Sequence, residues 1–407
     1  MKITTRLDDI HYLSILALSL RVNLMKPRLP RSGGLLFNPP STLSKRVASR
    51  RYTAPSSPTP SAPSPPKKRL WLRLTIVTAT AAGIGAYVRS QQGSESTTLN
   101  PVTFTKYRLV ARDPVSSNGS IFTLKPPKPD DNREAYEDAW KTGVWSVMFK
   151  QPQLQIGREY TPLPPITSKA QDEQEEGCLR FFIRKDPFGE VSRYLHSLDV
   201  GSPIEVRGPR IECEIPSDTR QILFIAGGTG IAPALQAGHT LLRRTDADHK
   251  PRLHILWANR RRDDCLGGYN DSSAIDEAQQ RSWFSGLFGS SKPSSPPLAG
   301  PTQDPAVTSL MVRELETLKA RYPGQVTVDY FVDEESSFIE KKSITRFTDS
   351  ASSHGSPGGK MILVSGPEGF ISYMAGPKLW AQGMELQGPL NGVIKELDLK
   401  DWAVWKL

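Results

Sequence analysis

The fold of the chain is decided by residues 222–233, which read ILFIAGGTGIAP. The first five residues form a short continuous apolar run, which is typical of a parallel strand covered on both faces. Glycines follow at once and let the backbone approach a phosphate closely, and Pro233 suits the first turn of a helix. A strand, a Gly-rich turn and a helix in this order predict the nucleotide-binding edge of a parallel sheet.

Downstream of this stretch the same pattern repeats. Continuous apolar runs recur at 253–259, 325–332 and 360–365, and helical sequence lies between them, notably at 307–322. We therefore predict a doubly wound α/β domain over residues 217–407. A Ser-, Pro- and Gly-rich insertion interrupts it at 265–306. The insertion contains RSWFSGLFG at 281–289, which either contacts a membrane or a partner or belongs to a disordered loop.

Upstream, residues 101–216 have a different character. Segments rich in β-branched and aromatic residues alternate there with Gly, Pro and Asn turns. This pattern predicts a small antiparallel β-barrel. The expected fold class is therefore α+β, with a barrel domain followed by a doubly wound α/β domain.

The barrel half carries a hexamer, REYTPL at 158–163, at the end of a predicted strand. A flavin needs an aromatic face, a hydroxyl or backbone donor, and a guanidinium for its pyrophosphate. Tyr160, Thr161 and Arg158 supply these groups. A Pro-terminated strand with an exposed Arg accounts for the same hexamer without any ligand.

A second motif, FGEVSRYL at 188–195, follows in the same half. Gly189 permits a close turn, and we expect Ser192 to cap a short helix whose free N–H groups bind an anion such as a pyrophosphate. Both features are also common at helix ends that bind nothing.

The order of REYTPL, GEVSRYL, VRGP at 206–209 and GGTGIAP resembles the ferredoxin-NADP reductase superfamily over residues 102–382. The resemblance implies a two-domain reductase in which a barrel binds FAD and the second domain binds NADH or NADPH as electron donor. The implied flavin contacts are Arg158, Tyr160, Thr161, Pro162, Gly189, Val191 and Ser192. The implied nucleotide contacts are Gly227, Gly228, Thr229, Gly230, Asn259, Arg260, Gly366 and Pro367. Thr161 and Ser365 are expected beside the reacting atoms.

One departure from the superfamily concerns the hydride pocket. Members commonly carry Cys-Gly-Pro where this chain has Ser365-Gly366-Pro367. A second open point is the donor, because Arg260, Arg261 and Arg262 suit the 2′-phosphate of NADPH unless Asp263 and Asp264 pair with them. We favour NADH.

Charge is concentrated at the N-terminus. The chain of 407 residues has a formal net charge of +10, yet residues 1–69 alone hold 13 Lys or Arg and two acids. A basic nucleic-acid face on the folded part is therefore not supported. Residues 1–52 have the composition of a mitochondrial presequence, with initiation at Met1 or Met25, although a disordered basic tail has the same composition. Three scattered cysteines and six histidines without a ligand motif predict no metal site.

An apolar segment follows a Pro-rich linker at 53–69. Residues 70–88 are long enough to cross a bilayer once, and Arg73 near their basic end can snorkel. The positive-inside rule then directs the catalytic domains to the intermembrane space, if the membrane is the inner mitochondrial one. The alternative is an amphipathic helix buried in a soluble domain.

A narrower resemblance covers residues 364–394, VSGPEGFISYMAGPKLWAQGMELQGPLNGVI. This stretch is similar to the fungal cytochrome c mitochondrial import factors. The resemblance implies electron transfer from NAD(P)H through FAD to haem or a haem protein such as cytochrome c, in support of the haem-attachment machinery. A general NADH-cytochrome reductase or diaphorase would share every motif, and a non-catalytic assembly factor is a third reading.

Overall fold

The computed structural model describes residues 75–83, 97–165, 177–244, 250–273, 308–353 and 359–407. The predicted presequence and Pro-rich linker lie outside these ranges, as does most of the insertion predicted at 265–306. Of the predicted membrane span, residues 75–83 are described, and they form a helix with exposed side chains. Within the described ranges no helix combines the length and the apolar character needed to cross a membrane.

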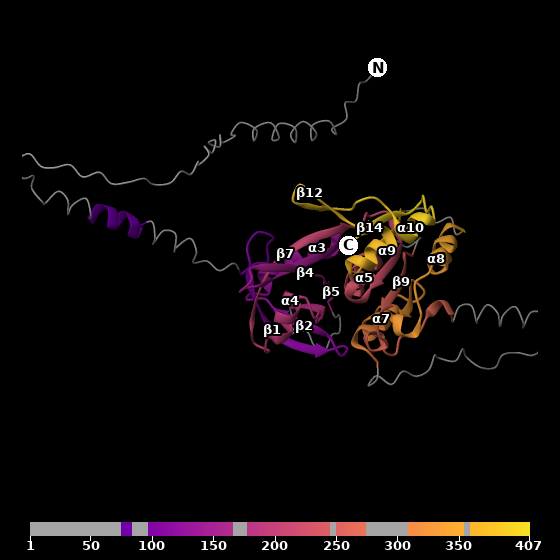
Figure 1. Ribbon diagram of the computed structural model, residues 1–407, viewed down its shortest axis with the longest axis horizontal. Coiled ribbons are helices and arrows are strands. Elements are labelled where there is room, and N and C mark those ends of the chain that lie inside the picture. Colours follow the sequence, from indigo (N-terminus) through magenta and orange to yellow (C-terminus); the bar gives the residue numbers. More distant parts are fainter. Residues whose placement is uncertain (1–74, 84–96, 166–176, 245–249, 274–307, 354–358) are drawn as a thin grey trace, which may run out of the picture. The chain divides into compact units, whose positions relative to one another are not determined.

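The first domain is an antiparallel sheet of seven strands in the order β4-β3-β7-β1-β2-β6-β5. Its part of the chain is drawn in indigo to magenta in Figure 1. Its elements are β1 (Thr105–Pro114), β2 (Gly119–Lys125), α3 (Arg133–Thr142), β3 (Gly143–Gln151), β4 (Ile156–Tyr160), β5 (Pro162–Leu163), β6 (Leu179–Arg184), α4 (Glu190–Ser197) and β7 (Pro203–Glu214). The two edge strands, β4 and β5, are separated in the chain by Thr161 alone. The sheet must therefore curve until its edges meet, as a barrel requires.

The second domain is a parallel sheet of five strands in the order β10-β9-β8-β11-β14. Its strands are β8 (Thr219–Gly227), β9 (Arg252–Asn259), β10 (Val326–Val332), β11 (Gly359–Ser365) and β14 (Ala403–Lys406), with a separate hairpin of β12 (Leu379–Ala381) and β13 (Met384–Leu386). Its helices are α5 (Ile231–Leu242), α7 (Leu310–Arg321), α8 (Lys341–Ser353), α9 (Glu368–Ala375) and α10 (Gly392–Glu396). The predicted combination of an antiparallel and a parallel domain is confirmed.

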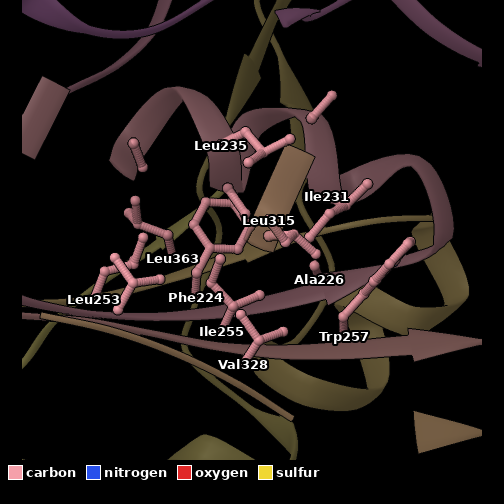
Figure 2. Close-up of a cluster of buried hydrophobic side chains, with 14 of the residues drawn as sticks. Phe224, Ala226, Ile231, Leu235, Leu253, Ile255, Trp257, Leu315, Val328 and Leu363 are labelled. Atoms are coloured by element: carbon pink, nitrogen blue, oxygen red, sulfur yellow. The ribbon is translucent and has the colours of Figure 1, made fainter. Parts of the chain in front are cut away.

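Strand β8 explains why the sequence reads ILFIA. Phe224 and Ala226 lie in a core formed with α5 and α7 (Figure 2), whereas Leu223 and Ile225 lie in a second core on the other face of the sheet. Because successive side chains of a strand point to opposite faces, burial on both faces requires an unbroken apolar run. Truncating Leu223, Phe224 or Ile225 to Ala should cost about 2–5 kcal/mol.

Helix α5 joins the two domains. All twelve of its residues are buried, and it packs against β3 and β5 of the first domain as well as β8 and β9 of its own. The ring of Trp140 on α3 lies edge-on to that of His239 on α5, with the two ring centroids 5.2 Å apart. Val144 and Leu163 of the first domain belong to the same core as Phe224. One hydrophobic core therefore runs through both domains and fixes their separation.

One edge of the second sheet, that of strand β10, carries side-chain hydrogen bonds on its backbone. Asp271 accepts a hydrogen bond from the backbone N–H of Val328 at 2.8 Å, and Asn270 accepts one from Tyr330 at 2.7 Å. Both acceptors belong to the start of the predicted insertion. This part of the insertion is therefore attached to β10.

Candidate active site

A first cavity of about 210 Å³ lies where the two domains meet. Among the residues that line it are Tyr160, Thr161, Thr229, Gly230, Ser365 and Gly366. Six of the predicted cofactor or catalytic residues, from three separate segments of sequence, are thus brought to one cavity. Both residues predicted to be catalytic, Thr161 and Ser365, are among them.

Tyr160 is held by the aromatic core of the first domain. Its ring lies edge-on to Phe149, with the two ring centroids 5.1 Å apart. Burial raises the pKa of Tyr160 to about 12, although the nearby charge of Arg158 acts in the opposite direction. The phenol therefore stays protonated at neutral pH, and its ring is a fixed apolar surface at the cavity wall.

Two loops of the second domain touch behind the cavity. A Cβ atom on Gly230 would lie 2.4 Å from the carbonyl oxygen of Ser365, so only glycine fits there. Contact between Gly230 and Ser365 brings the Gly-rich loop and the end of β11 to the same side of the cavity.

Pro162, which was predicted to contact the flavin, is buried next to Thr161 and does not line the first cavity.

Three polar residues that were not predicted from the sequence, Ser146, Glu159 and Glu212, line the first cavity. The hydroxyl of Ser146 donates to a carboxylate oxygen of Glu212 at 2.6 Å, and Arg210 pairs with Glu159 at 2.6 Å and with Glu212 at 3.6 Å. Burial raises the pKa of Glu212. These residues come from β3, β4 and β7, which become neighbours only in the folded sheet, so no local sequence signal marks them.

A second cavity of about 540 Å³ is lined by the five remaining predicted nucleotide contacts, namely Gly227, Gly228, Asn259, Arg260 and Pro367. Gly228 has a φ of +55°, and a Cβ atom on it would lie 3.2 Å from the guanidinium of Arg184. Glycine therefore keeps a narrow space open between the loop and an arginine of the first domain. Arg184 also pairs with Asp264 at 2.6 Å.

Asn259 bears directly on whether a ligand fits the second cavity. It is 2% exposed, and within the described part of the chain neither its amide nitrogen nor its amide oxygen has a hydrogen-bond partner. Leaving a buried polar group unpaired costs about 1–3 kcal/mol. Asn259 lines the second cavity, so its unpaired amide marks a site that a polar ligand such as a dinucleotide would complete.

The three arginines after β9 differ in their partners. Arg261 pairs with Asp263 at 3.3 Å, and Arg262 forms two hydrogen bonds to the carboxylate of Glu335, which lowers the pKa of Glu335. Arg260 lines the second cavity together with Asp333. The pairing expected for Asp263 is thus present, whereas Asp264 binds Arg184 instead. Asp333, which directly follows β10, was not predicted from the sequence.

The predicted pyrophosphate segment lies on α4, which packs against β4 and β3. Gly189 is the residue at the N-terminal end of this helix, and its Cβ would meet the hydroxyl oxygen of Ser192 at 2.6 Å. The expectation that Ser192 caps the helix is wrong, because Ser192 lies within the first turn and donates to the carbonyl of Gly189 at 3.2 Å. Val191 is buried, and Arg158 is exposed on the adjacent strand β4.

Comparisons with known proteins agree with this geometry. Residues 106–215 match the oxidoreductase FAD-binding domain, and residues 224–280 match the oxidoreductase NAD-binding domain. The chain therefore contains the FAD-binding and NAD-binding domains of an oxidoreductase. The first cavity lies between these two domains, and the second is formed mainly by the NAD-binding domain.

Several curated proteins are similar to this chain. NADH-cytochrome b5 reductase 1 of Emericella nidulans is 30% identical over 49% of this chain and 63% of the relative. Cytochrome c mitochondrial import factor CYC2 of Saccharomyces cerevisiae is 34% identical over 34% of this chain and 40% of the relative. In each case the match spans less than two thirds of the relative. Among solved structures, the cytochrome b5 reductase domain of Ulva prolifera nitrate reductase is 18% identical, with a TM-score of 0.43, over 68% of this chain and 91% of that one.

Proposed function

We propose that the protein is an NADH-dependent flavoprotein reductase that delivers electrons to haem or a haem protein. The observation that carries the proposal is the convergence of Tyr160 and Thr161 with Gly230 and Ser365 on one cavity between an FAD-binding and an NAD-binding domain. When bound there, FAD would supply the chemistry that links a two-electron hydride donor to a one-electron acceptor.

The protein's own contribution is binding, orientation and exclusion of water. We assign the flavin ring to the face of Tyr160, with Thr161 as a hydrogen-bond partner, and the pyrophosphate to Arg158 and the first turn of α4 at Gly189. Pro162, Val191 and Ser192 hold these segments in place. We place the boundary between the two domains at residues 216 and 217.

The nucleotide is assigned to the loop 227–230 and the second cavity. Glycines at 227 and 228 admit the pyrophosphate, and the unpaired amide of Asn259 would bind it or the adjoining ribose. Thr229, Gly366 and Pro367 would hold the nicotinamide end, with Ser365 in place of the superfamily's cysteine.

NADH is the proposed donor because of the charges in the second cavity. The carboxylate of Asp333 lies there and would bind the 2′-hydroxyl of a ribose while repelling a 2′-phosphate. Of the three arginines, Arg261 and Arg262 are already paired with carboxylates. Arg260 faces the same cavity as Asp333, so the local charge does not favour NADPH.

The decisive experiment purifies the full chain in detergent and records its absorbance spectrum under anaerobic conditions. A bound flavin should give bands that bleach when NADH is added and return when a ferric haem protein is added. No flavin, or a flavin spectrum that NADH leaves unchanged, would refute the catalytic proposal and favour a non-catalytic assembly factor.

We further propose that residues 1–52 direct the chain to mitochondria and that residues 70–88 anchor it in the inner membrane, with both cofactor domains in the intermembrane space. The charge of the leader and the similarity to CYC2 support this location. Protease treatment of mitoplasts should degrade the FAD-binding domain, whereas intact mitochondria should protect it. Recovery of the chain in the soluble fraction after carbonate extraction would contradict the anchor.

The proposed role is to support haem attachment to cytochrome c, with the attachment machinery as partner. A general NADH-cytochrome reductase is the second candidate, favoured by the name of the Emericella nidulans relative. Deleting the gene separates the two. Loss of holocytochrome c with normal apocytochrome c supports the first, and normal holocytochrome c supports the second.

A further inference from the structure

One buried carboxamide, that of Gln236 in the middle of α5, connects the NAD-binding domain to two strands of the FAD-binding domain. Its Oε1 accepts a hydrogen bond from the backbone N–H of Trp145 at 2.8 Å, and its Nε2 donates one to the backbone carbonyl of Pro162 at 2.8 Å. The residue is 0% exposed. Because water cannot replace either partner, both bonds are satisfied only while the two domains keep this arrangement.

Both partners of Gln236 are adjacent in the chain to residues that line the first cavity. Trp145 lies at a register shift between β3 and β7, where ladder pairing is interrupted, and its neighbours Val144 and Ser146 line the cavity. Pro162 directly follows Thr161, which lines the same cavity. The carboxamide therefore binds the backbone on two sides of the proposed flavin site.

The helix itself supplies the third side. Ala232 and Pro233 line the first cavity and precede Gln236 by four and three residues, which is one helical turn. Gly230 and Thr229 of the Gly-rich loop come immediately before this turn. A displacement at Gln236 would thus move the nucleotide loop relative to the Tyr160–Pro162 segment.

We propose that Gln236 is a positioning residue that sets the separation between the flavin and the nicotinamide for hydride transfer. The proposal rests on the reductase function proposed above. Hydride transfer needs reacting atoms about 3–3.5 Å apart, and a displacement of about 1 Å can cost on the order of 100-fold in rate. Two buried hydrogen bonds at fixed length across a domain boundary supply this kind of constraint.

Gln236→Met tests the proposal because methionine preserves the volume of the side chain and removes both hydrogen bonds. Thr240→Val is the matched control. Thr240 lies one turn further along α5, is buried, and donates to the carbonyl of Trp140 at 3.0 Å, so it also bonds the FAD-binding domain but away from the flavin segment. Both variants should lose similar stability, about 1–3 kcal/mol.

The two variants should differ in function. In Gln236→Met the rate constant of flavin reduction by NADH, measured by stopped flow, should fall about 10- to 100-fold, and the long-wavelength charge-transfer band of the reduced flavin with NAD⁺ should weaken. Its flavin content and its dissociation constant for NADH should stay near those of the unmodified chain. Thr240→Val should keep both the rate constant and the band.

Gln236→Glu gives a second test that does not depend on loss of packing. A neutral carboxylic acid donates to Pro162 and accepts from Trp145 as the amide does, whereas a carboxylate would face the Pro162 carbonyl oxygen. Burial raises the pKa of such a group, so the rate constant should be near normal at low pH and should fall as pH rises through that pKa. Titration of His239 on α5, or of Glu212 at the cavity wall, would appear in the unmodified chain as well.

Amide hydrogen exchange of the cofactor-free protein tests the connection without activity. Exchange at Trp145 should accelerate in Gln236→Met and stay slow in Thr240→Val. Equal hydride-transfer rates and an unchanged charge-transfer band in Gln236→Met, an equal loss in both variants, or a pH-independent Gln236→Glu would overturn the proposal. If the unmodified chain itself shows no flavin reduction, the proposed function fails, and the exchange rates still decide whether Gln236 holds the two segments together.

Discussion

The two cavities are built differently. The first takes residues from four strands of the FAD-binding domain, β3, β4, β6 and β7. The other domain contributes the Gly-rich loop and the start of α5, the end of β11, the region of the β12–β13 hairpin, and Leu407. The second takes all but Arg184 from the NAD-binding domain. The shape of the first therefore depends on how the domains pack, whereas the second is set by local charges and glycines. Changes at the first should alter the rate of hydride transfer, and changes at the second should alter the choice of nucleotide.

The largest effect is expected at the contact between the two loops. Gly230→Ala places a methyl group against the Ser365 carbonyl, 2.4 Å away, so both loops must move. Flavin reduction by NADH should slow on the order of 100-fold. The control is Gly359→Ala, whose added Cβ would meet its nearest neighbour at 3.5 Å. Stopped-flow absorbance measures both, and a normal rate in Gly230→Ala would show that the Gly230–Ser365 contact does not set the first cavity.

The next effect concerns flavin retention. Tyr160→Ala removes a ring that is packed on Phe149 and lines the first cavity, and we expect the dissociation constant for FAD to rise at least about tenfold. Tyr160→Phe keeps the ring and loses the hydroxyl alone, so it should bind FAD within about twofold of the unmodified chain. Flavin fluorescence on dilution gives both constants. If both variants bind FAD equally weakly, the hydroxyl of Tyr160, rather than its ring, is the group that binds the flavin.

At the second cavity, Asp333→Ser should change nucleotide choice without changing the rate with a saturating donor. Removing the carboxylate leaves Arg260 in the cavity, so the ratio of kcat/KM for NADPH to that for NADH should rise about tenfold, or about 1.4 kcal/mol. Steady-state rates with both donors measure it. Glu335→Gln releases Arg262 and should act in the same direction. If the ratio of kcat/KM changes in neither variant, Asp333 and Glu335 do not determine which donor the protein uses.

The smallest effect is on stability. Burial raises the pKa of Glu212 above its unfolded value, so the folded state binds a proton there more tightly than the unfolded state does. The stability that this group contributes is complete below the unfolded pKa and declines as pH rises through the folded pKa. Glu212→Gln should therefore melt at a temperature that, relative to the unmodified chain, rises with pH over this window. If the difference in melting temperature between the two proteins does not change with pH, the raised pKa of Glu212 is contradicted.

The sequence predicted the parts of the site whose chemistry is local. The apolar run of β8 and the glycines after it are adjacent in the chain, and the turn at Thr161 is short, so their types and order are informative. Asp333, Glu212 and Gln236 could not be found in this way. Each acts through a neighbour brought close by sheet order or by domain packing, which no spacing rule encodes.

The error at Ser192 has a similar cause. The residue type suits a helix cap, and the helix is present, but its first turn begins at Glu190. Helix boundaries depend on the competing bonds of the preceding turn. Here the backbone N–H of Asp186 donates to the Ser192 hydroxyl at 3.1 Å, which draws that side chain back toward the turn.

The side chains that cover β10 have a consequence for the protein in a crowded compartment. An exposed parallel edge strand offers unpaired N–H groups to which a strand of another molecule can add. Asp271 and Asn270 occupy the N–H groups of Val328 and Tyr330, and Asp271 also pairs with Lys319 at 2.7 Å. A carboxylate held in this position resists displacement by an incoming carbonyl. The start of the insertion therefore occupies two of the backbone donors that the addition of a strand from another molecule would need.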